Sequence, residues 1–266
     1  MFQARMSPLV SLIIASYNRE QYLSAAIESV LSQTFPDFEL LIWDDGSTDR
    51  SLEIARHYAQ QDQRVRVVAA AHQGIAQTRK AAIAHTTGAY LGWVDSDDLL
   101  HPHALAETVA ILNAHPETGM VYTDYLDMDA SGQVTDYGSR CQIPYSPERL
   151  LVDFMTFHFR LIRRQAFDRA GGIDPSFQYV YDYDLCLRLS EVTQVRRVQK
   201  PLYYYRSHSQ SRSVVAEQAR ILWSQRAIAL ALKRRGLTDR YTLQVTPAGK
   251  FILRRKSLTW AACRSS

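Results

Sequence analysis

Short apolar runs alternate with amphipathic helical stripes along the first 118 residues of the chain. Runs rich in β-branched residues predict buried strands at residues 9–16, 38–45, 64–70 and 89–94. Apolar residues at helical spacing predict helices at residues 22–31, 49–61, 75–86 and 104–114. Asn18 is expected to cap the first of these helices. Because strand and helix alternate with short connections, we predict an α/β fold with a mostly parallel sheet.

The pattern changes after residue 118, where strands and helices no longer alternate regularly. The elements expected there are a hairpin over 119–138, helical pieces near 164–170 and 182–191, and a strand over 195–206. Residues 214–235 predict a helix that carries several arginines, and the tail at 251–260 is basic and apolar. Two interpretations stay open for this end of the chain. Either the helix packs on the rest of the protein and the tail is solvated, or they lie at an anionic membrane surface.

Polar side chains gather where three of the predicted strands end. The clusters read SYN at 16–18, DDGSTD at 44–49 and DSDD at 95–98. Because ligands of such sheets bind beyond the carboxyl ends of the strands, we expect the three clusters to meet in one crevice. Neither a GxGxxG nor a GxxxxGK[ST] pattern is present, so the sequence supports neither a dinucleotide fingerprint nor a P-loop.

The DSDD cluster places three carboxylates within four residues. Adjacent like charges disfavour ionisation unless a cation offsets them, and Mg²⁺ and Mn²⁺ are bound by carboxylates in this way. Asp95 and Asp97 are two residues apart, so in an extended segment they project to the same side, whereas Asp98 is expected to cap a helix or contact protein. The alternative is a polar loop whose aspartates only cap the next helix.

Composition indicates the class of partner and the cellular location that the protein suits. The formal net charge of +4 fits anionic partners such as nucleotides or a membrane surface, and we expect no nucleic-acid partner. Cys141, Cys186 and Cys263 are far apart and show no CxxC spacing, which favours a reducing, cytoplasmic location over a disulfide framework or a zinc site. No apolar run approaches the roughly 18 residues of a membrane span.

Three stretches, at residues 10–49, 74–102 and 171–191, together resemble glycosyltransferase family 2. The resemblance implies inverting enzymes of the GT-A fold that transfer sugar from a nucleotide-diphosphate donor. It implies a GT-A domain over residues 1–210, with a nucleotide-sugar half at about 1–118 and an acceptor half at about 119–210. Residues 211–266 fall outside the resemblance and are expected to form a helical, basic extension.

The resemblance also implies roles for the residues of the nucleotide-sugar half. Tyr17 is expected to pack on the nucleotide base, with the backbone of Ala15 nearby. Asp45 is expected to read the base, and Arg79 to lie close to it. An aromatic face and a carboxylate acceptor suit a ring with N–H donors, such as uracil or guanine. From the residues alone, Tyr17 reads equally as crevice packing and Asp45 as a turn aspartate before Gly46.

The remaining roles concern the sugar diphosphate and the acceptor. In the DxD motif, Asp95 is expected near the ribose, Ser96 against the donor, and Asp97 on Mn²⁺ or Mg²⁺. His208 is expected to complete the metal shell or meet the diphosphate, although a lone histidine near a loop is often structural. Asp182 matches the aspartate that acts as the base, while Asp184 is expected only to favour a helix N-terminus.

The favoured function is therefore metal-dependent transfer of a sugar to an acceptor hydroxyl, with a UDP-sugar as the foremost donor. The acceptor is expected to be a saccharide or a lipid-linked saccharide, in the synthesis of a cell-surface polysaccharide or glycolipid. Two alternatives use a similar sheet. A sugar-phosphate nucleotidyltransferase is disfavoured because SYNRE stands where such enzymes carry a glycine-rich, lysine-containing loop. A non-catalytic nucleotide-sugar binder is disfavoured by the presence of both Asp97 and Asp182.

Overall fold

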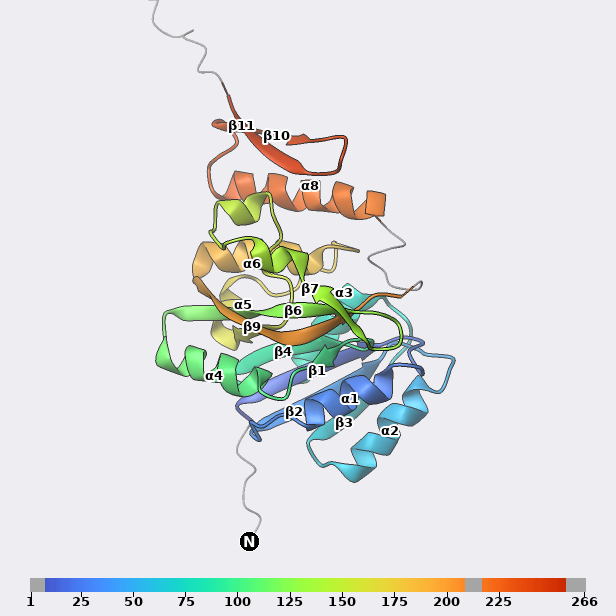
Figure 1. Cartoon of the computed structure of the whole chain (residues 1–266). Helices are drawn as coiled ribbons and strands as arrows, with labels where there is room; N and C mark the ends of the chain where they lie inside the picture. Colours follow the sequence, from blue (N-terminus) through green and yellow to red (C-terminus); the bar gives the residue numbers. More distant parts are fainter. Residues whose placement is uncertain (1–7, 209–216, 257–266) are drawn as a thin grey trace, which may run out of the picture.

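One nine-stranded sheet organises the chain in this computed structural model, which describes residues 8–208 and 217–256 (Figure 1). Its order is β3-β2-β1-β4-β8-β6-β9-β5, and β7 pairs with β6. The first four strands in this order run parallel to one another: β1 (Val10–Ser16), β2 (Phe38–Asp44), β3 (Val65–Ala69) and β4 (Tyr90–Asp95). The predicted parallel half of the sheet is thus confirmed.

The second half of the sheet mixes strand directions. It contains β5 (Leu99–Leu100), β6 (Thr118–Met128), β7 (Val134–Tyr137), β8 (Arg160–Arg163) and β9 (Gln194–Arg206). β8 lies antiparallel to both β4 and β6, whereas β6 and β9 run parallel. The predicted hairpin is present as β6 and β7. This change of direction beside β4 brings the second half of the chain against the ends of the parallel strands.

Helices cover both faces of the sheet (Figure 1). One core cluster contains α1 (Leu23–Leu31), α2 (Ser51–Gln61) and α4 (Ala104–Ala114). The other contains α3 (Ile75–Ala84), α5 (Arg164–Arg169) and α6 (Tyr181–Val192). In β1, Leu12 and Ile14 belong to the first cluster and Ile13 to the second, as expected for a strand buried on both faces.

The C-terminal extension packs on the second of these faces. Its helix, α8 (Glu217–Arg234), buries Ala227, Ile228, Ala231 and Leu232 in the core cluster that contains α6. A hairpin of β10 (Tyr241–Val245) and β11 (Phe251–Arg255) follows, and sequence analysis did not predict it. In Figure 1, α8 lies between this hairpin and α6. Of the two interpretations of this helix, the structure supports the one in which it packs on the rest of the protein.

The loop after β1 differs from the prediction in one respect. Asn18 is not the cap of α1, whose N-cap residue is Tyr22. Instead, Asn18 has a φ of 52°, and its side-chain oxygen accepts a hydrogen bond of 2.8 Å from the Thr48 N–H. This bond ties the loop after β1 to the loop after β2. Asparagine adopts such left-handed conformations more readily than most residues.

The helices of residues 8–208 and 217–256 include none with the combination of length and apolar character that a membrane span needs.

Candidate active site

The carboxyl ends of β1, β2 and β4 open onto one cavity of about 900 Å³. Every donor-side residue expected from the sequence lines it: Ala15, Tyr17, Asp45, Arg79, Asp95 and Ser96. Asp97 and Asp182 line the same cavity, and His208 reaches it through a contact with Asp97. The convergence expected of the three polar clusters is therefore present.

At one end of the cavity, Tyr17 offers an exposed aromatic face. Its ring is 42% exposed and stacks on His72, with centroids 4.1 Å apart and planes inclined by 28°. Asp45 is buried beside it and accepts hydrogen bonds of 3.0 Å from the N–H groups of Gln73 and Gly74. His72 Nδ1 lies 2.9 Å from the same carboxylate. Asp45 thus fixes the loop that carries His72 against Tyr17.

The turn after Asp45 makes this close approach feasible. Gly46 has a φ of +79°, and a Cβ there would lie 2.8 Å from the backbone nitrogen of His72. A side chain at this position would therefore push the His72 loop away. Sequence reasoning missed His72; its place just beyond the third predicted strand is the signal that could have found it.

Arg79 connects the end of β4 to the start of α6. Its guanidinium is 3% exposed and donates hydrogen bonds to Asp95 and to the Tyr181 hydroxyl. Burial by itself raises the pKa of Asp95, but the charges and the hydrogen bond of its neighbours, with Arg79 foremost, together outweigh burial and hold this pKa at about 2. Arg79 also lies over the ring of Trp93, at 5.5 Å. Its contact with a nucleotide base stays a prediction.

Asp97 and His208 form the pair that best fits a divalent cation. His208 Nε2 lies 3.0 Å from Asp97 Oδ2, and both side chains belong to loops beside the cavity. The Nε of Arg19 contacts the same oxygen at 3.3 Å, which places a positive charge beside the carboxylate. A carboxylate and an imidazole that face the same open space suit Mg²⁺ or Mn²⁺, whose coordination shell water and phosphate oxygens would complete.

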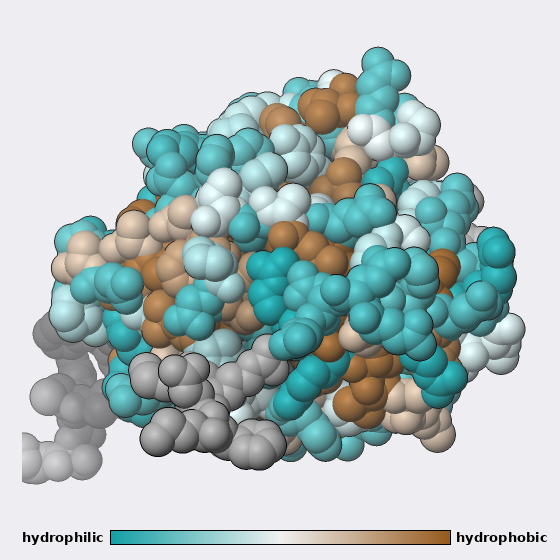
Figure 2. Space-filling view, turned by 90° about the horizontal axis from the view of Figure 1, so that it is seen from below, coloured by the Kyte–Doolittle hydropathy of each residue, from teal (hydrophilic) through white to brown (hydrophobic). Residues whose placement is uncertain are grey.

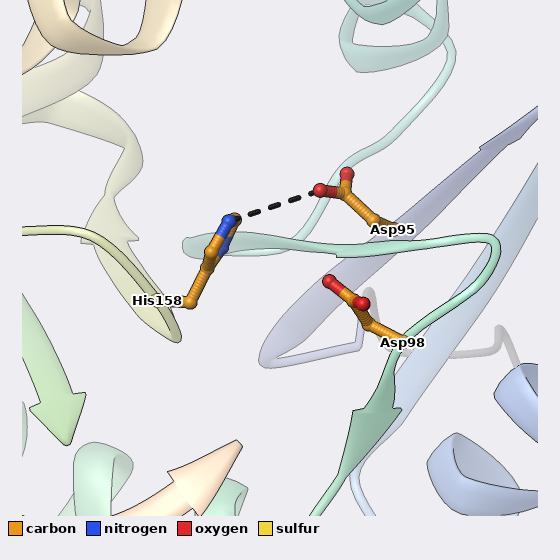
Figure 3. Close-up of side chains that lie close together, drawn as sticks. All are labelled: Asp95, Asp98 and His158. Atoms are coloured by element: carbon orange, nitrogen blue, oxygen red, sulfur yellow. Dashed lines mark ion pairs between the residues drawn. The ribbon is translucent and has the colours of Figure 1, made fainter. Parts of the chain in front are cut away.

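A second group of side chains that could hold a cation lies nearby, formed by Asp95, Asp98 and His158 (Figure 3). Their ligand atoms lie within 4.8 Å of one another, and the Nε2 of His158 is 3.8 Å from Asp95 Oδ2. However, Asp98 is 1% exposed and accepts hydrogen bonds of 2.7 Å from the Tyr203 hydroxyl and from the Arg206 N–H. Asp98 therefore contacts protein, which is one of the two roles expected for it.

The carboxylates of this group already bind protein, since Arg79 donates to Asp95, and the Tyr203 hydroxyl and the Arg206 N–H donate to Asp98. Burial, with the charges of Asp97 and Asp95, raises the pKa of Asp98 well above its usual range. Burial, with the charge of Arg160, lowers the pKa of His158 to about 3, so this imidazole is neutral. Arg79 already neutralises Asp95. The pair of Asp97 and His208 is consequently the better cation site of the two.

Asp182 stands at the first turn of α6 and lines the cavity from the side of the second half of the chain. Its Oδ2 accepts a hydrogen bond of 3.2 Å from the buried Arg160 guanidinium, and its Oδ1 accepts one of 2.9 Å from the Tyr183 N–H. Asp184 points elsewhere, is 2% exposed and pairs with Arg188 at 2.7 Å. Only Asp182 of this pair is therefore placed to meet a substrate.

Comparisons with known proteins agree with this geometry. The family model described as glycosyl transferase family 2 matches residues 11–171, which is more than half of the chain. The chain is 33% identical over 207 residues to the chondroitin synthase of Escherichia coli, a match that covers 78% of this chain and 30% of that protein. The chain thus spans less than a third of the length of this relative.

Two solved structures show the same fold. S. aureus TarS 1-349 in complex with UDP-GlcNAc superimposes with a TM-score of 0.65 at 20% identity, over 85% of this chain and 66% of that one. The mannosyltransferase PcManGT from Pyrobaculum calidifontis in complex with GDP-Man and Mn²⁺ gives 0.61 at 17% identity, over 88% and 76%. The cavity at the strand ends and its DxD motif agree with the family match over residues 11–171. This chain therefore belongs to glycosyl transferase family 2 and has the GT-A fold.

Proposed function

We propose that the protein transfers a sugar from a nucleotide-diphosphate donor, with a UDP-sugar as the foremost candidate, to an acceptor hydroxyl with inversion. One observation carries this proposal: a single cavity brings the strand-end residues together with Asp182 from the second half of the chain. The relatives support the donor class, since one structure holds UDP-GlcNAc and another GDP-Man with Mn²⁺. The chondroitin synthase relative supports a place in cell-surface polysaccharide or glycolipid synthesis.

The base of the nucleotide is proposed to lie at the Tyr17 end of the cavity. The exposed ring of Tyr17, backed by His72, offers a stacking surface, with the backbone of Ala15 alongside. Asp45 lines the same region, where a carboxylate oxygen accepts from a ring N–H such as that of uracil. Asp95 and Ser96 then follow along the donor toward the diphosphate.

The diphosphate is proposed to lie beside Asp97 and His208, which would hold a Mn²⁺ or Mg²⁺ ion. When bound, the ion would offset the negative charge that develops on the departing nucleotide diphosphate. Arg19 lies against the same carboxylate and adds a fixed positive charge there. With the diphosphate held there, the sugar would extend toward Asp182, which lines the same cavity.

Asp182 is proposed to accept the proton of the acceptor hydroxyl. A hydroxyl has a pKa far above 7, so attack on the sugar carbon needs a proton acceptor in the transition state. Each oxygen of Asp182 accepts one hydrogen bond from protein, and each retains a lone pair for the acceptor. Arg160 and Tyr183 fix the orientation of this carboxylate relative to α6.

The test is nucleotide release from UDP-GlcNAc and from GDP-mannose with Mn²⁺, combined with the Asp182→Asn variant. The variant should bind nucleotide like wild type and lose transfer by about 10²- to 10⁴-fold, which is the usual contribution of a general base. Asp153→Asn serves as a matched control, because Asp153 lines the cavity but pairs with Arg149 at 3.0 Å. Transfer at the wild-type rate in Asp182→Asn would refute the assigned base, and binding without any nucleotide release would indicate a non-catalytic binder.

A further inference from the structure

The C-terminal extension forms one wall of the cavity. Arg220, Ile221 and Ser224 of α8 line it, as do residues 248–250 of the turn between β10 and β11 and the first residue of β11, Phe251. These residues lie beyond the family match, which ends at residue 171. Family membership therefore says nothing about what this wall contacts.

The turn between β10 and β11 is held in place by a close contact with α8. Gly249 has a φ of +71°, and a Cβ there would lie 2.9 Å from the Cδ1 of Ile221. Phe251 packs against the core cluster that contains α8. These contacts fix the position of Lys250, which lines the cavity from the same turn. The wall is thus built by packing and not by an isolated loop.

The region beside this wall is positively charged. Arg140 lines the cavity, and within the described residues no ion pair joins its guanidinium to a carboxylate. It donates to the Phe154 carbonyl at 2.8 Å and lies over the Phe157 ring at 4.5 Å. Burial, together with the charge of Arg220, lowers the pKa of Arg140. Arg140, Arg220 and Lys250 thus bring three cationic side chains to one cavity, where they would stabilise a bound anion.

Aromatic rings line the cavity beside these cations. The rings of Phe154 and Phe157 meet edge to face at 5.9 Å, and Phe157 meets Tyr205 at 5.3 Å. An apolar surface with a few charged groups is typical of sites that orient small ligands. Asp182 lines the same cavity as Arg140, so a ligand bound beside these cations shares the cavity with the proposed base.

We propose that Arg140, Arg220 and Lys250, with the aromatic side chains of Phe154 and Phe157, bind an acceptor saccharide that carries a negative charge. The charged group is a carboxylate, as in a uronic acid, or a phosphate, as in a lipid diphosphate sugar. The C-terminal extension thereby selects the acceptor. This inference rests on the proposed function, because it assigns the acceptor side of the same cavity.

The test measures binding to the full chain with UDP and Mn²⁺ present, by isothermal titration calorimetry. The carboxylate probe is a tetrasaccharide with alternating glucuronic acid, the phosphate probe is farnesyl diphosphate N-acetylglucosamine, and the neutral probe is maltotetraose. At least one anionic probe should bind about tenfold or more tightly than the neutral probe. Arg140→Gln and Arg220→Gln should each weaken that binding about tenfold, as expected for a charge-assisted hydrogen bond. Arg226→Gln is the matched control, since Arg226 lies on α8 over Phe177 and Trp223 and does not line the cavity.

The outcomes separate this inference from the proposed function. If neither UDP nor GDP binds the wild-type protein, the proposed function fails, and the acceptor assignment fails with it. If a nucleotide binds but no anionic probe is preferred, or no probe binds at all, only the acceptor assignment is overturned. It is also overturned if Arg140→Gln and Arg220→Gln weaken nucleotide binding as much as probe binding, because the cations would then serve the donor.

Discussion

Within the four residues from Asp95 to Asp98, each side chain has different surroundings. Asp95 pairs with the buried Arg79, and Ser96 is buried at the cavity wall. Asp97 contacts His208, whereas Asp98 is buried and bonded to protein. Because neighbouring carboxylates share neither burial nor partners, their chemistry differs despite their identical side chains. Asp97 lines the cavity with an imidazole nitrogen 3.0 Å from its carboxylate, whereas the imidazole nearest Asp95 lies 3.8 Å away.

Asp97→Asn should remove most of the metal-dependent part of nucleotide binding. We expect the affinity for UDP or GDP with Mn²⁺ to fall at least about tenfold, because an amide oxygen is a far weaker ligand for a hard cation than a carboxylate. The unfolding free energy should change by about 1 kcal/mol or less, since partly exposed ion pairs contribute little. Calorimetric titration with nucleotide, with and without EDTA, measures both states. Equal affinities of variant and wild type in Mn²⁺ would exclude Asp97 as a ligand.

His158 should make the protein less stable in mild acid. Its pKa is lowered from 6.5 to about 3 in the folded protein, so the unfolded chain binds its proton first as the pH falls. Above pH 6.5, His158 is neutral in both states and does not lower the unfolding free energy. Between pH 6.5 and about pH 3, it lowers the unfolding free energy by up to about 1.4 kcal/mol for each pH unit of acidification. His158→Phe keeps a ring that stacks on Tyr203, which lies at 4.7 Å, and removes the titrating group.

The measurement for His158 is urea unfolding at several pH values between 7 and 4.5, compared between wild type and His158→Phe. The variant should show the shallower loss of stability. His115→Gln, at a site with a 40% exposed side chain, is the control and should follow wild type. Parallel curves for wild type and His158→Phe would show that His158 titrates in its ordinary range.

Among the elements, α8 contributes to the core as a helix of the main body does. Its buried residues lie on one side, where they contact α6, while Leu222 is 66% exposed. Glu191 of α6 also receives ion pairs from Arg234 at 2.7 Å and from Arg235 at 3.1 Å. The extension is therefore held by apolar packing and charge together, and its position at the cavity follows from this packing.

Leu232→Ala should destabilise the whole protein by about 2–5 kcal/mol, which is the usual cost of truncating a buried leucine. Leu232 is 4% exposed. Leu222→Ala makes the same chemical change on the exposed side of α8 and should cost less than about 0.5 kcal/mol. Urea unfolding of both variants gives the comparison. Similar small effects for both would mean that α8 is not docked on α6 as the structure shows.

At the scale of the whole molecule, the C-terminal hairpin changes the membrane hypothesis. Phe251 and Leu253 pack against the core cluster, so they are not available to enter a membrane. Ile252 is 42% exposed, and the exposed basic residues beside it are Arg254, Arg255 and Lys256. Any membrane contact by this hairpin would therefore be mainly electrostatic. Residues 257–260 of the predicted basic and apolar tail lie outside the described residues.

If the hairpin binds membranes, Arg254→Gln, Arg255→Gln and Lys256→Gln together should abolish sedimentation with anionic vesicles. Each basic residue near such a surface contributes roughly 1 kcal/mol, so the three together correspond to about a hundredfold loss. Wild-type binding should also disappear at high salt, because exposed charges are screened.

A matched triple of exposed cations elsewhere, at Arg50, Arg56 and Lys80, gives the control for this prediction. Changing all three of these residues to glutamine should leave the sedimentation of the protein with anionic vesicles unchanged. Absence of wild-type binding to anionic vesicles at low salt would leave the hairpin without a membrane role.

The sequence by itself determined the parallel half of the sheet, the β6–β7 hairpin and the cavity-facing clusters. Apolar periodicity reflects which side of an element is buried, and this information lies within about ten neighbouring residues. The ends of parallel strands share one edge, so Tyr17, Asp45 and Asp97 could be assigned to one crevice from their positions alone. The three resembling stretches then pointed to the family.

Only the tertiary structure decided which side chains share a site across long stretches of chain. The stacking of Tyr17 on His72 and the hydrogen bond from Arg79 to Tyr181 each join separate elements, and Arg140 and Arg220 reach one cavity from separate helices. Such contacts depend on how whole helices and strands pack, which no local pattern encodes. For the same reason, the β10–β11 hairpin and its place at the cavity became apparent only when α8 was seen docked on α6.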